Sequence, residues 1–201
     1  MLKKKKGLLV ILLAALVVGN TMTVSAAAPS QTERVMYLTN NQTGETCEVL
    51  AKETTTVKQT GNRYTVTKVA ELYIPEDSSA IVPYTSITDA GATTRIHLNV
   101  DYTQSGKRYR LNGVSGRFEQ LDTAFTISGR HVMYTCQSNI VDGHVWNKYP
   151  TSNSFSYSRC DHWVDTGANI EWWIGAYAEC TISRGGSSWT LKATEDVIRN
   201  V

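Results

Sequence analysis

Apolar and polar residues alternate with a period of two along most of the chain, and no long segment shows the 3.6-residue period of a helix. The clearest example is the segment "TRIHLNVDY" at 94–102. Its apolar face contains Ile96, Leu98, Val100 and Tyr102, and its polar face contains Arg95, His97, Asn99 and Asp101. This pattern is typical of an antiparallel strand with one buried face. The same criteria predict further strands at 46–51, 63–74, 107–112, 121–128, 130–137, 172–183 and 188–194.

Short segments rich in Gly, Asn and Ser separate these strands: "QTGNR", "TQSGKR", "ISGRH" and "SRGGSS". Such residues adopt positive φ angles at little cost, so each segment predicts a tight turn. The glycines of "NGVSG" have neither a lysine at Walker spacing nor a following helix, and they are interpreted as a bulge or turn. Two segments do not alternate: 141–165 is predicted as a long loop, and 195–200 is a candidate for a short helix.

The fold predicted from this pattern is all-β. Successive strands joined by short turns indicate hairpins, and about eight or nine strands of this kind indicate an antiparallel β-sandwich, although a barrel has the same local pattern. No internal repeat and no low-complexity linker divides the chain, so a single domain is expected.

The first 28 residues have the layout of a secretory signal peptide. Four lysines precede an apolar run from Leu8 to Val18, and small residues follow it. The run is shorter than the roughly 20 residues of a membrane-spanning helix. Cleavage is expected after Ala26 or Ala28, which would release a secreted domain at 29–201 with no membrane anchor. The lysine-rich start is typical of a bacterial export signal.

Removal of this signal changes the sign of the net charge. The four lysines leave without any acidic residue, so Lys and Arg fall from 20 to 16 against 18 Asp and Glu. The formal charge then changes from +2 to −2. The positive charge of the full chain therefore belongs to the export signal, and nucleic acid is not expected as a partner.

The chain contains four cysteines, Cys47, Cys136, Cys160 and Cys180. An even number in an exported chain, with no C-x-x-C pair, predicts two disulfides rather than thiols or zinc ligands. Four cysteines allow three connectivities. Alternation places Cys136 and Cys180 on the apolar faces of their strands, where facing sheets could bring them within bonding reach. The favoured pairing is therefore Cys136–Cys180 and Cys47–Cys160.

All five tryptophans lie in the last third of the chain. Trp172 and Trp173 are neighbours, so on a strand they must face opposite sides. We expect Trp172 to point inward and Trp173 to point outward together with Tyr177. With Trp146 and Trp163 of the 141–165 segment, these rings would form a stacking platform for a carbohydrate, a peptide or a protein. The alternative is that the rings fill the core.

Signals for catalysis and for metal binding are weak. Cys160 and His162 could act as nucleophile and base, but an oxidising compartment argues against a free thiol. Asp161, His162, Asp165 and Glu171 could gather around a cation, although no local spacing of a metal motif is present. There is no G-x-S-x-G segment. No catalytic residue, metal site or cofactor is predicted.

The function expected from these observations is a secreted, non-catalytic binding module whose contact surface lies within 141–189. The ligand and the oligomeric state are left open. Two other classes also remain open. One is a small secreted hydrolase with its site in the 141–165 loop, and the other is a structural or host-directed exported protein with no small ligand.

Overall fold

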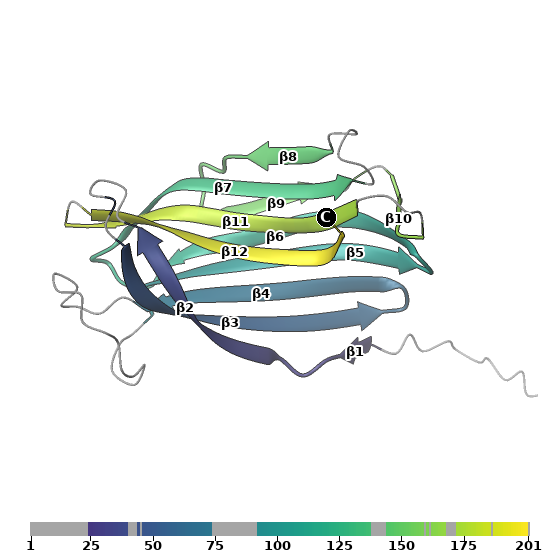
Figure 1. Cartoon of the computed structure of the whole chain (residues 1–201), viewed down its shortest axis with the longest axis horizontal. Helices are drawn as coiled ribbons and strands as arrows, with labels where there is room; N and C mark the ends of the chain where they lie inside the picture. Colours follow the sequence, from purple (N-terminus) through teal and green to yellow (C-terminus); the bar gives the residue numbers. More distant parts are fainter. Residues whose placement is uncertain are drawn as a thin grey trace, which may run out of the picture.

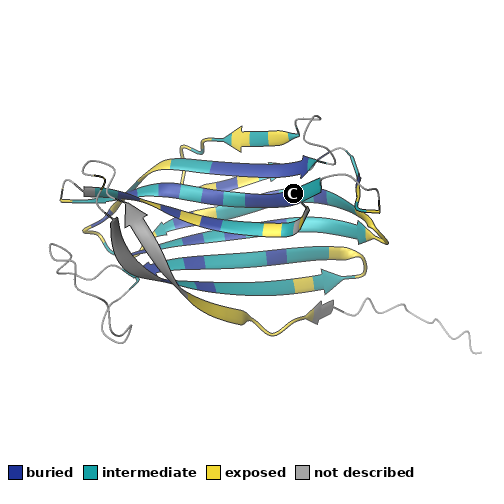
Figure 2. Ribbon diagram, viewed as in Figure 1, coloured by how far each residue is buried: buried dark blue, intermediate teal, exposed yellow. Residues whose placement is uncertain are grey.

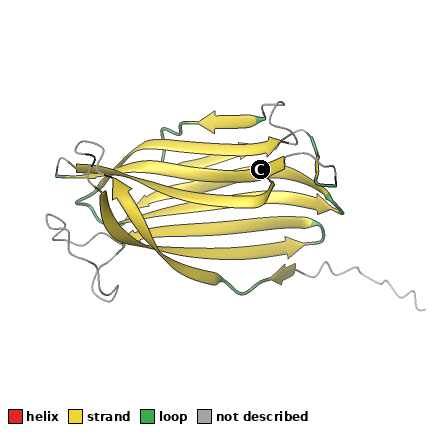
Figure 3. Cartoon of the chain, in the orientation of Figure 1, coloured by secondary structure: helices red, strands yellow, loops and turns green. Residues whose placement is uncertain are grey.

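The computed structural model describes residues 24–39, 44, 46–73, 92–137, 144–158, 160, 162–167, 172–185 and 187–200. Within these residues every regular element is a β-strand (Figure 3). The strands are β1 (Val24–Ala26), β2 (Ser30–Thr39), β3 (Thr46–Thr60), β4 (Arg63–Tyr73), β5 (Thr94–Ser105), β6 (Arg108–Gln120), β7 (Thr126–Gln137), β8 (Val145–Lys148), β9 (Ser154–Ser158), β10 (Val164–Asp165), β11 (Trp172–Arg184) and β12 (Ser187–Asn200). No described helix has the length and apolar character needed to cross a membrane.

The strands form two antiparallel sheets that pack face to face (Figure 1). The larger sheet has the order β1-β3-β4-β5-β6-β10, with β2 added on β3 and β9 added on β6. The smaller sheet has the order β12-β11-β7-β8. The prediction of an all-β fold with antiparallel sheets is thus confirmed.

The core lies between the two sheets and is built from the apolar faces of their strands (Figure 2). Ile96, Leu98 and Val100 of β5 are completely buried, as alternation predicted. From the smaller sheet, Ile174 and Leu191 are buried against the same cluster. Because successive side chains of a strand point to opposite faces, the residues between them lie on the outer faces of the sandwich.

Three of the four predicted turns are hairpins. Gly61, Gly106 and Gly185 lie at the β3–β4, β5–β6 and β11–β12 turns with φ angles of 61°, 60° and 56°. Gly129 of "ISGRH" also has a positive φ of 53°, but it lies inside β7 beside a register shift. Residues 126–137 are therefore one strand with a bulge, and the prediction of a turn at Gly129 is wrong. Residues 121–125 of the strand predicted at 121–128 are not in a strand.

Two further predictions are corrected. Residues 195–200 continue β12 rather than forming a helix, because they pair with β11 as far as Asn200. The 141–165 segment contains β8, β9 and β10 and is not one long loop. The bulge predicted at "NGVSG" is confirmed, since the β5–β6 register shifts between Asp101 and Tyr102 opposite this segment.

Gly116 marks the tightest approach between strands in the larger sheet. A Cβ atom at this position would lie 2.0 Å from the His97 carbonyl oxygen of β5 and 2.7 Å from Cζ of Phe155 in β9. The Phe155 ring covers Gly116, its register partner, and packs 5.5 Å from the Phe118 ring. This position therefore has room for no side chain.

A buried charged cluster joins the two sheets near β12. Lys68 of β4 donates a hydrogen bond of 2.7 Å to the Thr194 carbonyl oxygen of β12. Its Nζ also lies 3.4 Å from Glu195 Oε2 and 3.9 Å from Glu53 Oε2. All three charged side chains are less than one-fifth exposed. Burial raises the pKa of Glu195, and the charge of Lys68 offsets part of this increase.

Most of the predicted signal peptide lies outside the described residues. Val24–Ala26 forms β1, which pairs with the end of β3 in the full chain. Cleavage after Ala26 or Ala28 would remove this strand.

Candidate functional site

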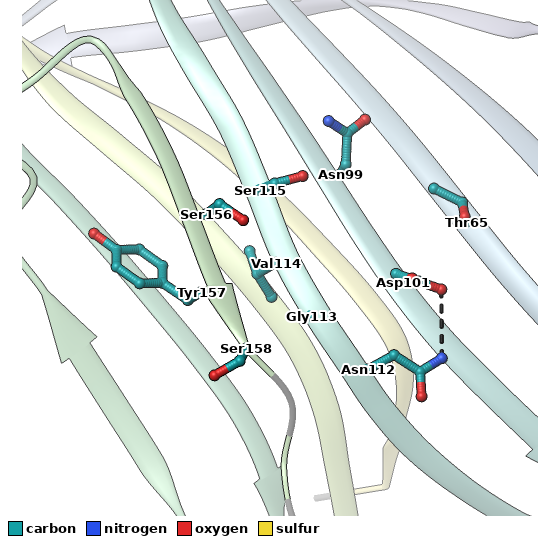
Figure 4. A pocket seen from close by; sticks show the side chains of 10 residues that line it. All are labelled: Thr65, Asn99, Asp101, Asn112, Gly113, Val114, Ser115, Ser156, Tyr157 and Ser158. Carbon is teal, nitrogen blue, oxygen red and sulfur yellow. Dashed lines mark hydrogen bonds between the residues drawn. The ribbon is translucent and has the colours of Figure 1, made fainter.

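A pocket of about 670 Å³ opens on the outer face of the larger sheet, across β4, β5, β6 and β9 (Figure 4). Its lining residues are Thr65, Asn99, Asp101, Asn112, Gly113, Val114, Ser115, Ser156, Tyr157 and Ser158. The Tyr157 side chain points away from the pocket and stacks on Tyr134 of β7, with ring centroids 5.9 Å apart. The side chains that face the pocket are therefore mainly hydroxyls, amides and one carboxylate.

The strand register explains why these polar groups lie together. Two neighbouring rows cross the four strands: Thr67, Asn99, Ser115 and Ser156 in the first, and Thr65, Asp101, Gly113 and Ser158 in the second. Gly113 adds no side chain to its row, so a hollow remains between Asp101 and Ser158. The β-bulge brings Asn112 to the same place.

Asp101 is held in position by its neighbours. Arg63 Nε donates to both carboxylate oxygens at 2.9 and 3.1 Å, and its Nη2 also contacts Oδ2. Asn112 Nδ2 lies 3.4 Å from Oδ1 and donates a shorter bond of 2.9 Å to Thr103 Oγ1. The hydrogen bonds and charge of Asp101 raise the pKa of Arg63 above its ordinary value. The carboxylate is thus oriented before any ligand arrives.

Other groups of the pocket are available to a ligand. Within the described part of the chain, the hydroxyls of Ser115, Ser156 and Ser158 make no hydrogen bond with other groups of the protein. Ser156 and Ser158 are exposed, and Thr67 Oγ1 donates to Asn99 Oδ1 at 2.8 Å, which leaves the Asn99 amide group to donate outward. The pocket therefore combines fixed acceptors with adaptable hydroxyls.

Trp163 lies near one end of this polar surface. Its ring is covered by the guanidinium groups of Arg108 and Arg110, at 5.4 and 4.9 Å from the ring centroid. Arg110 precedes the buried Leu111 and therefore faces the outer side of the sheet, two residues before Asn112. Trp163 thus contacts Arg108 and Arg110 of β6, neither of which is among the residues that line the pocket.

The outer face of the smaller sheet carries a second group of polar and aromatic side chains. His131 of β7 lies 2.8 Å from Glu179 Oε1 and 2.9 Å from Asn147 Oδ1. The Tyr149 ring, which is 71% exposed, stacks on His131 with a centroid distance of 4.7 Å. The Tyr177 ring meets His131 edge-on at 5.3 Å. No local spacing in the sequence connects His131 with Tyr149.

Trp173 and Tyr177 point outward on this face, as predicted. Trp173 Nε1 donates to Asp196 Oδ1 at 2.8 Å, and Arg199 lies 5.0 Å from its ring centroid. Lys192 Nζ lies 3.5 Å from the Tyr177 ring centroid. Trp172 packs against the core, which confirms the predicted orientation of the Trp172–Trp173 pair.

The four predicted contact residues do not form one platform. Trp146 of β8 stacks on Tyr134 at 5.2 Å and packs against the core cluster. Trp163 precedes β10 and contacts Arg108 and Arg110 of the larger sheet, while Trp173 and Tyr177 belong to the outer face of the smaller sheet. The prediction of a joint surface of all four residues is therefore wrong.

The predicted disulfides are not present among the described residues, where none of Cys136, Cys160 and Cys180 is in a disulfide. Cys136 pairs with Ile174 on the neighbouring strand β11 of the same sheet, whereas Cys180 lies six residues further along β11. At about 3.3 Å per residue the offset is roughly 20 Å, too far for a bond. The favoured Cys136–Cys180 pairing is therefore incompatible with the register. The Cys47 side chain lies outside the described residues.

Cys136 and Cys160 instead lie together, next to His144 and His162. The two imidazole rings are 4.2 Å apart, and His144 Nδ1 and His162 Nε2 are buried without a hydrogen-bond partner in the described structure. No three His, Cys, Asp or Glu side chains among the described residues are arranged to hold a metal ion. Asp161 and Glu171 of the hypothetical cation site lie outside the described residues.

Charged side chains of β5 and β6 surround Glu119 on the outer face of the larger sheet. Glu119 Oε2 lies 3.0 Å from His97 Nε2 and 3.1 Å from Arg95 Nη1, and Oε1 accepts a bond of 2.5 Å from Arg117. Burial raises the pKa of Glu119, but the hydrogen bonds and charges of His97, Arg117 and Arg95 outweigh this effect and hold the pKa below its ordinary value.

Replacing Glu119 by Gln should therefore lower the free energy of unfolding by about 0.5–1 kcal/mol at pH 7. An acid with a lowered folded pKa stabilises the fold above its unfolded pKa of about 4.3, and this contribution disappears as the pH falls through the folded value. Urea titrations at pH 7 and pH 3 measure the difference between the two proteins. A deficit that is equal at both pH values would contradict the electrostatic explanation.

Comparison with known proteins gives no relative from which a function could be transferred: no family model, no curated protein and no solved structure matches the chain.

Proposed function

We propose that the chain is a secreted, non-catalytic binding module that holds a polyhydroxylated ligand, a carbohydrate, in the pocket on the outer face of the larger sheet. The observation that carries the proposal is the two neighbouring rows of hydroxyl, amide and carboxylate side chains, with a hollow at Gly113 in the second row. Sugar hydroxyls donate and accept hydrogen bonds, so they match a surface that offers both kinds of group.

Each group has a distinct role in this proposal. Asp101 accepts a hydrogen bond from one ligand hydroxyl, since a carboxylate has about four acceptor sites and Arg63 and Asn112 supply three donor groups. Ser115, Ser156 and Ser158 rotate their hydroxyls to suit the ligand. Arg108 and Arg110, which cover the Trp163 ring, supply hydrogen-bond donors at the end of a longer ligand.

The composition of the pocket favours binding over hydrolysis. Among the described lining residues, Asp101 is the one carboxylate, whereas glycoside hydrolysis generally needs a pair of carboxyl groups. Cys160, the nucleophile of the hypothetical Cys-His site, is completely buried. A hydrolase or a structural role without a small ligand remains testable with the same reagents: turnover of a bound oligosaccharide would favour the first, and no binding to any oligosaccharide the second.

Replacing Asp101 by Ala should weaken carbohydrate binding at least tenfold. Each hydrogen bond to a charged acceptor contributes about 1.5–3 kcal/mol, and 1.4 kcal/mol corresponds to a factor of ten in Kd. The fold should be preserved, because Arg63 is 61% exposed and an exposed ion pair contributes little to stability. The measurement is a titration of the secreted protein with neutral hexasaccharides of glucose, mannose and N-acetylglucosamine, followed by nuclear magnetic resonance or calorimetry.

Two matched variants on the other sheet serve as controls. Trp173→Ala and Tyr177→Ala change the outer face of the smaller sheet and should leave binding unchanged. If these two variants lose the ligand while Asp101→Ala keeps it, the binding site is the aromatic surface around His131, and the assignment to the pocket is wrong.

A further inference from the structure

We infer that Cys136 and Cys160 form an inter-sheet disulfide in the exported protein. Cys136 lies in β7 of the smaller sheet, and Cys160 follows β9 at the edge of the larger sheet. Both residues are completely buried in the common core. The bond would join the two layers of the sandwich and would close the segment that contains β8 and β9.

The local contacts bring the two sulfurs to the same point. The Cys160 amide donates a bond of 3.1 Å to the Leu111 carbonyl oxygen of β6, and the Cys136 thiol interacts with the Leu111 backbone from the other sheet. On its other side, Cys136 Sγ lies 4.0 Å from the His162 carbonyl oxygen, two residues after Cys160. The Cys160 thiol lies close enough to Cys136 for a hydrogen bond between them to lower the Cys136 pKa. The two sulfurs are not bonded, so the disulfide requires them to move closer together.

The chemistry of the thiols favours the same pair. The hydrogen bond from Cys160 lowers the pKa of Cys136, even though burial acts in the opposite direction. Burial raises the pKa of Cys180 to about 12, which disfavours its thiolate form. Because the thiolate is the attacking species in thiol–disulfide exchange, Cys136 is the better nucleophile.

The reaction takes place as the exported chain folds, with a small-molecule disulfide or an oxidoreductase disulfide as the oxidant. The Cys136 thiolate attacks this disulfide, forms a mixed disulfide and releases one thiol. The Cys160 thiolate then attacks the Cys136 sulfur and releases the second thiol. Two protein thiols lose two electrons and two protons, and the oxidant is reduced to two thiols.

This bond has a consequence for the proposed pocket. The strand β9 carries Ser156 and Ser158, and it is attached to β6 along five register pairs from Gly113 to Arg117. Cys160 follows this strand by two residues, so the disulfide would anchor the wall of the pocket to the smaller sheet. This second consequence rests on the proposed carbohydrate pocket, whereas the bond itself rests only on the proposed export of the chain.

The test is peptide mapping of the secreted protein, folded with oxidised glutathione, after alkylation in denaturant without reduction. Trypsin alone leaves Cys160 and Cys180 in one peptide, 160–184, so a glutamyl endopeptidase that cuts after Glu171 is added. The expected result is one cross-linked species that joins the peptides of Cys136 and Cys160, about 2 Da lighter than the two reduced peptides. By exclusion, Cys47 and Cys180 would be joined to each other or alkylated.

Three results would overturn the inference. The first is alkylation of Cys136 and Cys160 without reduction, and the second is a bond from either of them to Cys47 or Cys180. The third is a protein that binds one equivalent of zinc while Cys136 and Cys160 both remain thiols, which would indicate a metal site formed with His144 and His162.

A double variant adds a readout that does not depend on mapping. Reduction of the unmodified protein should lower the melting temperature by roughly 5–15 °C, and in Cys136→Ala/Cys160→Ala this decrease should be absent or should fall to the contribution of any bond between Cys47 and Cys180. An equal effect of reductant on both proteins would contradict the inference. A measurement of carbohydrate binding before and after reduction tests only whether the disulfide anchors the wall of the pocket, not whether the disulfide forms.

Discussion

Replacement of Lys68 by Met should lower the free energy of unfolding by about 3–5 kcal/mol at pH 7, as expected when one member of a buried ion pair is removed. Lys68 is the cation that lies between Glu53 and Glu195 and also caps the Thr194 carbonyl oxygen. Methionine retains most of the side-chain volume, so the loss is electrostatic rather than a cavity effect. Urea denaturation of the two proteins measures the change.

The pH dependence identifies the cause. Burial already raises the pKa of Glu195, and loss of the lysine charge should raise it further. An acid with a raised folded pKa destabilises the fold when it is ionised, and this cost decreases as the pH falls through the raised value. The deficit of Lys68→Met should therefore be smaller at pH 4.5 than at pH 7.

Two further proteins act as controls for this prediction. Lys58→Met, at an exposed position in β3, should change stability by no more than about 0.5 kcal/mol. The double variant Lys68→Met/Glu195→Gln should recover at least half of the loss, because one buried negative charge is removed as well. A pH-independent deficit, or no recovery in the double variant, would show that Lys68 acts through packing.

Gly116→Ala should destabilise the protein by about 3 kcal/mol or more, or prevent it from folding. The new methyl group would have to displace the backbone of β5, since the His97 carbonyl oxygen would lie 2.0 Å away. A flexible side chain could move aside, but a strand paired on both sides cannot shift without breaking its register. Thermal and chemical denaturation measure this effect.

Gly113→Ala is the matched variant in the same strand. A Cβ there would meet only the Tyr157 carbonyl oxygen at 3.1 Å, so the expected cost is about 1 kcal/mol or less. Adding Phe155→Leu to Gly116→Ala removes ring contact but leaves the backbone contact, and it should not restore stability. Recovery in this double variant would show that the ring, rather than the carbonyl group, excludes the methyl group.

Alternation was sufficient to predict the strands of the core and their faces. Residues 94–102 lie in β5 with the predicted face buried, because nothing interrupts their alternation of apolar and polar residues. The region 121–137 was divided wrongly, since Gly129 has the positive φ of a turn but occupies a bulge. Local sequence gives a glycine its backbone freedom, whereas the pairing partner decides how that freedom is used.

The candidate site was harder to predict than the fold. Asn99 and Asp101 were on the polar face of the clearest strand, but a polar face usually indicates only contact with solvent. Their meeting with Ser156 and Ser158 depends on β9 pairing with β6 across about 40 positions of sequence. The alternating "SFSYS" at 154–158 is the signal that could have identified β9. The cysteine contact had no local signal, because it depends on how the two sheets are stacked.

The position of Glu195 also affects how the molecule meets other copies of itself. Among the described strands, β12 pairs with β11 on one side only, so its other side is an open edge at which a foreign strand could add. Glu195 points toward the core from this edge and retains a small path to water. If a strand of another molecule paired with β12, the Glu195 carboxylate would lose its remaining contact with water, which costs free energy. The charged cluster of Lys68, Glu53 and Glu195 therefore opposes self-association through β12.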